Sequence, residues 1–307
     1  MNPPTAQAQT KRYTCPSCKD KGFTLSNLNG RVQVDACSCF HCAKCDGEGR
    51  IFQENEKGIS YLAACDCTLL KKRFRILEDA GIPGKFVHAD FDSFIKHHQT
   101  QGRAKRVAMD FVQDFLKAKN NLSRGMIFMG APGLGKTHLA VAVIKALTLE
   151  QGIDCRFVDF FQLLSDIRHG FSEDMSDQAF IKPYQQARVL VIDELAKGRN
   201  TEWELTVLDQ LISNRYNAAD KVTIFTTNYS VESKIAKEVY SGEMEDQNDR
   251  KEKSVKNYAD GYMRESLQEK IGARIYSRLA EMCKFVMIQG QDLRQKGMAV
   301  PHRYPRP

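Results

Sequence analysis

The segment "GAPGLGKT" (130–137) constrains the fold of this chain more than any other feature of its sequence. It fits the pattern GxxxxGK[ST] at every fixed position, it follows the apolar run "MIFM", and it opens the helical pattern "THLAVAVIKAL". Between a strand and a helix, such a loop wraps phosphate groups with its backbone N–H groups, and the helix N-terminus adds partial positive charge. The sequence therefore predicts a nucleotide-binding strand–loop–helix unit.

Apolar, strand-like segments alternate with helical patterns through the rest of the chain. The expected strands are 126–130, 155–159, 189–194, 222–228 and 284–288. Such alternation is typical of an α/β fold, with a mostly parallel sheet and helices on its faces. A helix expected over 102–119 carries apolar residues on one face and should pack against the core. By contrast, 241–261 is nearly free of aliphatic residues and is expected to be an exposed, mobile insertion.

Two carboxylates follow the apolar run of "VLVIDE" (189–194), so they should lie at the C-terminal end of a strand, where α/β sheets bind ligands. We expect Asp193 to share a Mg²⁺ ion with Thr137, and Lys136 to reach the β- and γ-phosphates. Glu194 is expected to orient and activate the attacking water. The residues predicted to contact the nucleotide are Gly130, Ala131, Pro132, Gly133, Leu134, Gly135, Lys136, Thr137 and His138.

Three further residues are candidates for the same chemistry. Asn228 ends "VTIFTTN" and could hold the attacking water, although an asparagine at a strand end is more often a cap or turn residue. Arg274 and Arg278 are four residues apart on one face of the helix expected over 269–283. They are either a solvated basic face or an arginine finger that completes the site of a neighbouring subunit.

Eight of the ten cysteines lie between residues 15 and 67, where the sequence repeats itself. Each copy, 15–39 and 42–67, runs CxxC, a glycine four residues on, a middle glycine, and CxC seven residues after it. Clustered cysteines of this spacing indicate metal ligation rather than disulfides in a cytoplasmic chain. Each copy is predicted to be a zinc ribbon, because a CxxC turn aims two thiolates at one metal and a β-hairpin returns the CxC pair to it.

Near-equal loops favour two consecutive sites over a nested arrangement, in which the first CxxC would join the last CxC. The predicted ligands are Cys15, Cys18, Cys37 and Cys39 for one zinc ion and Cys42, Cys45, Cys65 and Cys67 for the other. Four thiolates leave no open coordination position, so both metals should be structural. The remaining two, Cys155 and Cys283, lie in apolar segments and are expected in the core.

Residues 82–295 together resemble AAA+ ATPases, and more narrowly the DnaC/DnaI-type bacterial helicase loaders. The resemblance is carried by "GIPGKFVHADFDSF", "GAPGLGKTHLA", "VLVIDEL", "LDQLISNRYN", "TTN", and "GARIYSRL" followed by "DLR". It implies an AAA+ core without a helical lid, Arg274 as the arginine finger with Arg278 beside it, and Arg294 at the sensor 2 position. Each cysteine repeat also resembles the CxxCxGxG modules of DnaJ-type co-chaperones, although the chain has no J-domain.

The resemblance implies an ATP-dependent loader of a DnaB-type hexameric replicative helicase onto single-stranded DNA, in replication initiation or restart. ATP, Mg²⁺ and two Zn²⁺ would be bound, the zinc domain would contact the helicase, and the ATPase domain would self-associate. DNA contacts are expected along 160–170, where Phe160 or Phe161 could stack a base, and at Lys197 and Arg199. The alternative for Phe160, Phe161, Leu163 and Leu164 is that all four lie in the core. The alternatives are an IstB-type transposition helper ATPase, and a zinc-ribbon adaptor with a vestigial ATP site. The intact ATP motifs argue against the adaptor, and the tandem zinc ribbons and arginine pair favour the loader over the IstB type.

The 307 residues, 42% hydrophobic and 27% charged, are typical of a globular, soluble chain. No apolar run approaches the roughly 20 residues that span a bilayer, and the N-terminus has no secretory signal, so we expect a cytoplasmic protein with no membrane contact. A formal charge of +7 permits a nucleic acid or an acidic protein as partner. The expected parts are a tandem zinc-ribbon domain (1–67), a linker helix with a pre-core segment (68–101), and an AAA+ domain (102–307).

Overall fold

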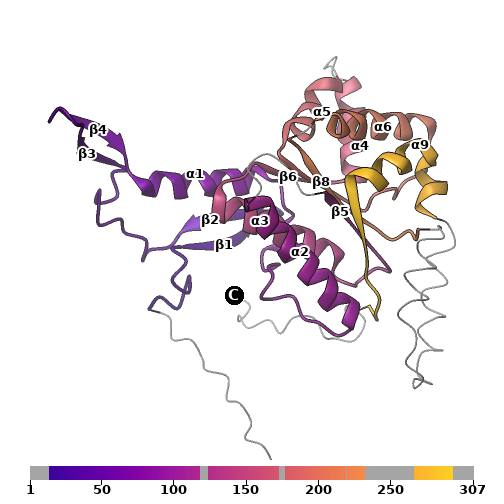
Figure 1. Ribbon diagram of the computed structural model, residues 1–307, viewed down its shortest axis with the longest axis horizontal. Helices are drawn as coiled ribbons and strands as arrows, with labels where there is room; N and C mark the ends of the chain where they lie inside the picture. The colour runs from indigo at the N-terminus through magenta and orange to yellow at the C-terminus, as the bar shows by residue number, and fades with distance from the viewer. Residues whose placement is uncertain (1–13, 118–123, 173–176, 219, 232–265, 293–307) are drawn as a thin grey trace, which may run out of the picture.

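The computed structural model describes residues 14–117, 124–172, 177–218, 220–231 and 266–292 (Figure 1). Its centre is a five-stranded sheet, all parallel, in the order β6-β7-β8-β5-β9. These strands are β5 (Gly125–Met129), β6 (Cys155–Asp159), β7 (Val189–Asp193), β8 (Val222–Thr227) and β9 (Cys283–Met287). The α/β fold is confirmed, and each of the five predicted strands is present with its ends within one residue of the prediction.

The strand order decides which chain segments meet. Strand β8 lies between β5, which leads into the phosphate loop, and β7, which carries Asp193. All residues of these three strands are buried, as expected for central strands that helices cover on both faces. Because the strands are parallel, their C-terminal ends lie at the same edge of the sheet.

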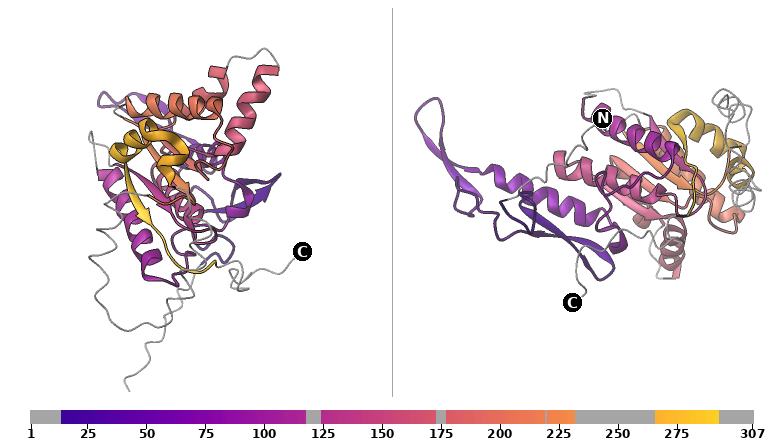
Figure 2. Two further views of the ribbon diagram at one scale, coloured as in Figure 1. Left: turned by 90° about the vertical axis from the view of Figure 1, so that its right-hand side faces the viewer. Right: turned by 90° about the horizontal axis from the view of Figure 1, so that it is seen from below.

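Helices cover both faces of the sheet (Figures 1 and 2). They are α2 (Gln99–Lys117), α3 (Lys136–Gln151), α4 (Phe160–Ser172), α5 (Asp177–Gln186), α6 (Glu202–Tyr216) and α9 (Leu267–Met282). One apolar cluster joins α2 and α3 to the sheet, and another joins α4, α5, α6 and α9 to its opposite face. Cys155 and Cys283 are fully buried, one in each cluster, which confirms their predicted core positions. No helix in the described ranges is long and apolar enough to cross a membrane.

The N-terminal residues form two antiparallel hairpins and a helix. The first hairpin is β1 (Phe23–Leu28) with β2 (Arg31–Ala36), the second is β3 (Arg50–Glu54) with β4 (Ser60–Ala64), and α1 (Asp66–Asp79) and η1 (Gly84–Phe86) follow. Helix α1 therefore begins inside the last CxC motif, two residues before its predicted start. The second hairpin projects away from the rest of the molecule (Figures 1 and 2).

The first hairpin is packed onto the body through α1. Val32 and Val34 lie in the same apolar cluster as Phe74 and Leu77 of α1 and the core residues of α3. The Glu78 carboxylate also accepts a hydrogen bond from the backbone N–H of Val34 at 3.1 Å. Apolar packing is therefore continuous from the first hairpin into the sheet, and the division of the chain at residues 67 and 101 stays a prediction.

Candidate nucleotide site and cysteine clusters

The phosphate loop connects β5 to α3 at the C-terminal edge of the sheet. Gly135, the residue before α3, has a left-handed backbone with φ +88°. A Cβ atom at this position would lie 2.5 Å from the ring of Phe94, so both the conformation and the space require glycine. The strand–loop–helix unit that the sequence predicts is therefore formed.

Lys136 is buried inside this loop, with 7% of its surface exposed. Its ammonium group donates hydrogen bonds to the carbonyl oxygens of Gly130 and Ala131, both at 2.7 Å. The cation is thus held by the two residues that begin the loop. A positive charge at this position suits a nucleotide's phosphates.

Asp193, at the end of β7, lies against the first turn of α3. Its Oδ1 accepts hydrogen bonds from the Thr137 hydroxyl at 2.8 Å and from the Thr226 hydroxyl at 2.6 Å. Burial raises the pKa of the Asp193 carboxyl above its ordinary value, while the two hydroxyl donors partly oppose that effect. A carboxylate and a hydroxyl from two different elements therefore meet where the sequence places a Mg²⁺ site.

Thr226 was not predicted as a site residue. Besides donating to Asp193, its hydroxyl accepts a hydrogen bond from the backbone N–H of Glu194 at 3.0 Å. It therefore connects both acidic residues to β8. A threonine near the end of an apolar strand was the available signal, but only the order of the strands shows that this strand lies beside β7.

Glu194 follows β7 in a left-handed conformation, φ +55°, which is uncommon for a residue with a side chain. Its carboxylate forms an ion pair with Lys197, and the carboxylate raises the pKa of that lysine. Asn228, half-buried, directly follows β8. Since β8 lies between β5 and β7, the chain places Asn228 between the strand of the phosphate loop and the strand of Glu194.

His138, which was predicted to contact the nucleotide, holds the pre-core segment 84–98. Its Nε2 atom lies 2.8 Å from the carbonyl oxygen of Asp90, and its ring meets the Phe94 ring edge-on at 5.2 Å. Burial lowers the pKa of His138, which favours the neutral imidazole. The histidine thus attaches the segment before the core to the helix that follows the phosphate loop.

Gln101 of α2 is a second residue that the sequence did not single out. It is fully buried, its side-chain oxygen accepts from the backbone N–H groups of His97 and His98, and its amide donates to the carbonyl of Leu134 at 3.4 Å. It connects the pre-core segment to the phosphate loop.

The segment that follows β9 also reaches the phosphate loop. Asp292 approaches so closely that a Cβ atom at Gly133 would lie 1.8 Å from its carboxylate. Arg294 lies outside the described residues.

Arg274 and Arg278 share one face of α9 but have different surroundings. Arg278 donates to the Asp209 carboxylate at 2.6 Å and to the Ser213 hydroxyl at 2.7 Å, and 24% of its side chain is exposed. The Arg274 side chain is 75% exposed and lies 3.4 Å from the same carboxylate. Of the two arginines, Arg274 has the exposure needed to reach another chain.

The expected DNA-contacting helix divides into core and surface. Phe160, Leu163 and Leu164 are buried in the cluster on the α4 face of the sheet, whereas Phe161 is 62% exposed. Lys197 is engaged with Glu194. Stacking of a base on Phe160 is therefore not available in this conformation, and Phe161 is the aromatic residue of the pair that solvent can reach.

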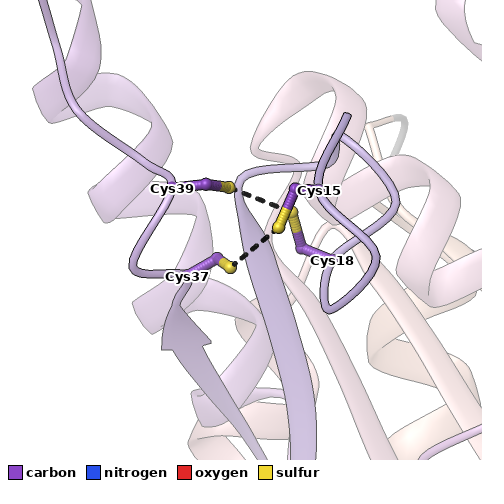
Figure 3. Close-up of side chains that lie close together, drawn as sticks. All are labelled: Cys15, Cys18, Cys37 and Cys39. Atoms are coloured by element: carbon purple, nitrogen blue, oxygen red, sulfur yellow. Dashed lines mark hydrogen bonds between the residues drawn. The ribbon is translucent and has the colours of Figure 1, made fainter. Parts of the chain in front are cut away.

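The eight N-terminal cysteines form two separate groups of four, in the consecutive arrangement. In each group the sulfur atoms all lie within 4.8 Å of one another. Sulfur–sulfur distances between the CxxC and CxC cysteines include Cys15–Cys37 3.7 Å, Cys18–Cys39 3.3 Å, Cys42–Cys65 3.6 Å and Cys45–Cys67 3.4 Å. Figure 3 shows the first group, in which the CxxC turn faces the CxC pair that follows β2.

Backbone N–H groups support the sulfur atoms at equivalent places in the two repeats. The N–H of Gly22 donates to the sulfur of Cys18 at 3.3 Å, and the N–H of Gly49 donates to the sulfur of Cys45 at 3.2 Å. Such bonds stabilise thiolate sulfur and orient a ligand from outside the metal shell. The repeat in the sequence is therefore also a repeat in hydrogen bonding.

Both donor sets fit the ions that the sequence implies. Sulfur atoms around tetrahedral zinc, at about 2.3 Å from the metal, lie about 3.8 Å apart, and the observed separations are close to this value. The hard oxygen donors of Thr137 and Asp193 match the preference of Mg²⁺. The residues present could therefore hold two zinc ions and one magnesium ion.

A known protein family matches the part of the chain that carries the nucleotide site. The IstB-like ATP binding protein family matches residues 71–238, more than half of the 307-residue chain. Two Bacillus subtilis (strain 168) proteins, uncharacterized protein YqaM and phage-like element PBSX protein XkdC, are each 25% identical to it. The matches cover 66% and 69% of this chain and 70% of each relative.

Helicase loaders are also among the similar proteins. The replicative helicase loader DnaC of Escherichia coli (strain K12) is 24% identical over 61% of this chain and 74% of its own length. A crystal structure of the DnaC helicase loader matches with a TM-score of 0.51 and 29% identity, covering 67% of this chain and 99% of that chain. This chain belongs to the IstB-like ATP binding protein family, and its ATP-binding AAA+ core is distantly related to the DnaC helicase loaders.

Proposed function

We propose that this chain is an ATP-dependent loader of a DnaB-type replicative helicase onto single-stranded DNA. The observation that carries the proposal is the similarity to the solved DnaC helicase loader, which extends over 99% of that chain at 29% identity. A match of this extent includes nearly the whole of the solved chain and not only the phosphate loop. The nucleotide site would act as the switch, and the N-terminal cysteine repeats would bind the helicase. A reducing cytoplasm would keep these cysteines from forming disulfides.

In the proposed hydrolysis, Lys136 neutralises charge on the β- and γ-phosphates, and Glu194 orients the attacking water and takes its proton. A Mg²⁺ ion held by Thr137 and Asp193 would stabilise the charge that develops on the phosphates. Glu194 must separate from Lys197 before it can act as a base. The Lys197 side chain is 63% exposed, so water can readily replace this ion pair.

Substitution of these residues separates binding from turnover. We expect Lys136→Ala to abolish ATP binding, since it removes the buried cation of the loop. Glu194→Gln should bind ATP normally and lose hydrolysis by a factor of about 100 or more, because it removes the group that activates the water. Nucleotide binding by fluorescence and phosphate release would measure both. A Glu194→Gln protein with the wild-type hydrolysis rate would contradict the assignment.

We also propose that the two cysteine groups each bind one structural zinc ion. Each site has four sulfur donors, which leaves no position for a substrate. The zinc ions would stabilise hairpins that are too small to have a large core of their own.

The second candidate function is that of an IstB-type transposition helper ATPase. The matched family, IstB-like ATP binding protein, favours this candidate, and the ATP-binding motifs fit both candidates. Purification of the tagged full-length chain from the cells that produce it would separate the two. Co-purification of a DnaB-type helicase is expected for the loader, and of a transposase for the helper. Recovery of neither, with the Glu194→Gln variant and ATP present to hold the bound state, would count against both.

A further inference from the structure

The two N-terminal hairpins carry equivalent apolar pairs. Counted from the CxxC and CxC motifs, Leu25 corresponds to Phe52 and Val34 corresponds to Leu62. The register pairs Leu25 with Val34 in the first hairpin and Phe52 with Leu62 in the second. Residues directly opposite each other in an antiparallel pair point to the same face. Each hairpin therefore presents one apolar pair at the same place on the same face.

In the first hairpin a helix covers this pair. Val34 is only 7% exposed, Leu25 packs beside it, and both contact the apolar cluster that includes Phe74 and Leu77 of α1. Phe74 and Leu77 are three residues apart, so they lie on one face of the helix. The Glu78 carboxylate then accepts from the Gln33 side chain at 2.8 Å, which fixes the helix on the strand.

In the second hairpin the same face is exposed. Phe52 is 81% exposed and Leu62 is 51% exposed, while Ile59 at the turn is 58% exposed. Ile51, which points to the opposite face, packs against the second cysteine cluster. The hairpin projects from the body, and the helix that follows it, α1, runs back to cover the first hairpin (Figure 1). Within the described residues no helix covers Phe52 and Leu62.

We propose that the Phe52–Leu62 face of the second hairpin binds a basic amphipathic α-helix of a partner protein, in the way that α1 covers the first hairpin. Residues 46–57 carry four carboxylates, Asp46, Glu48, Glu54 and Glu56, against two cations, Arg50 and Lys57, a net charge of −2. Helix α1 carries four cations within 71–75. Glu54 lies two residues from Phe52 on the same face of β3, and Glu56 is in the turn that follows. A helix with two apolar residues three positions apart and cations beside them therefore complements both the apolar pair and the charge of this face.

This inference deepens the proposed loading function, because it assigns a surface and a secondary structure to the partner contact, but its test needs no helicase. The probe is a fluorescent peptide with the sequence of 68–82, "TLLKKRFRILEDAGI", which contains the residues that cover the first hairpin. Fluorescence anisotropy would measure its binding to the zinc-loaded full-length protein. We expect saturable binding that a peptide with Phe74→Ser and Leu77→Ser does not show.

Variants of the protein locate the binding. Phe52→Thr with Leu62→Thr should weaken peptide binding at least tenfold, since threonine suits a strand but removes the apolar pair. The matched control is Tyr61→Thr, which changes an exposed side chain on the opposite face and should leave affinity within twofold. Zinc content is measured for each variant, and Phe52→Thr alone, expected to weaken binding at least threefold, is used if the double variant loses metal.

Three outcomes would overturn the proposal. The first is no saturable binding of the peptide to the wild-type protein. The second is equal peptide binding by the wild type and by the variant with Phe52→Thr and Leu62→Thr. The third is concentration-dependent dimerisation that the Phe52 and Leu62 substitutions abolish. The last outcome, measured by sedimentation, would assign the face to a second copy of the chain. If the peptide binds as expected but no helicase co-purifies, the result counts against the loading function and not against the helix-binding face.

Discussion

At the scale of single residues, Arg274 and Arg278 are two arginines on one helix with different surroundings. Arg278→Ala removes charge-assisted hydrogen bonds to Asp209 and Ser213. We expect it to destabilise the fold by about 1–3 kcal/mol. Arg274→Ala should change stability by less than about 1 kcal/mol, because its side chain is exposed, yet should lower hydrolysis in assembled protein. Denaturant unfolding and phosphate release would measure the two effects, and equal destabilisation would contradict the assignment.

Asp193 gives a prediction on pH. Burial raises its pKa in the folded state, so the unfolded state loses the proton first as pH rises. This carboxyl therefore lowers stability progressively above its ordinary pKa of about 3.9. In protein free of Mg²⁺ and nucleotide, Asp193→Asn should raise the melting temperature at pH 7, with a smaller gain near pH 4. Its amide oxygen still accepts from both threonines. A gain independent of pH would show that burial of the charge is not the cause.

At the scale of elements, the two hairpins should respond differently to loss of zinc. The first has β2 packed against α1, whereas the second has little beyond its cysteine cluster. We expect two Zn²⁺ per chain by elemental analysis. Chelation should abolish hydrogen-exchange protection in 50–64, leave part of the protection in 31–36, and preserve ATP binding. One metal per chain, or equal loss of protection in both hairpins, would contradict this.

At the scale of the whole molecule, ATP hydrolysis should require contact between chains. Arg274 is on the face of the body formed by α6 and α9 and is open to solvent. A mixture of Arg274→Ala and Lys136→Ala proteins should therefore be more active than either alone, because one supplies an intact nucleotide site and the other an intact arginine. Activity equal to the sum of the separate proteins would mean that the arginine does not act on a neighbouring site.

Sequence alone determined the features that are encoded within short segments. The phosphate loop, the five strands and the two cysteine quartets all follow from local spacing, since a turn, a strand or a CxxC motif is specified by neighbouring residues. The consecutive grouping of the cysteines followed from the near-equal loops that close them.

Tertiary structure alone decided what depends on the order and packing of these elements. The placement of β8 beside β7 brings Thr226 to Asp193, and the packing of α9 on α6 ties Arg278 to Asp209 while leaving Arg274 exposed. The fold of α1 back onto the first hairpin leaves the equivalent face of the second one open. Each of these contacts joins residues distant in sequence, so no local pattern specifies it, and the burial of apolar surface over the whole chain selects it.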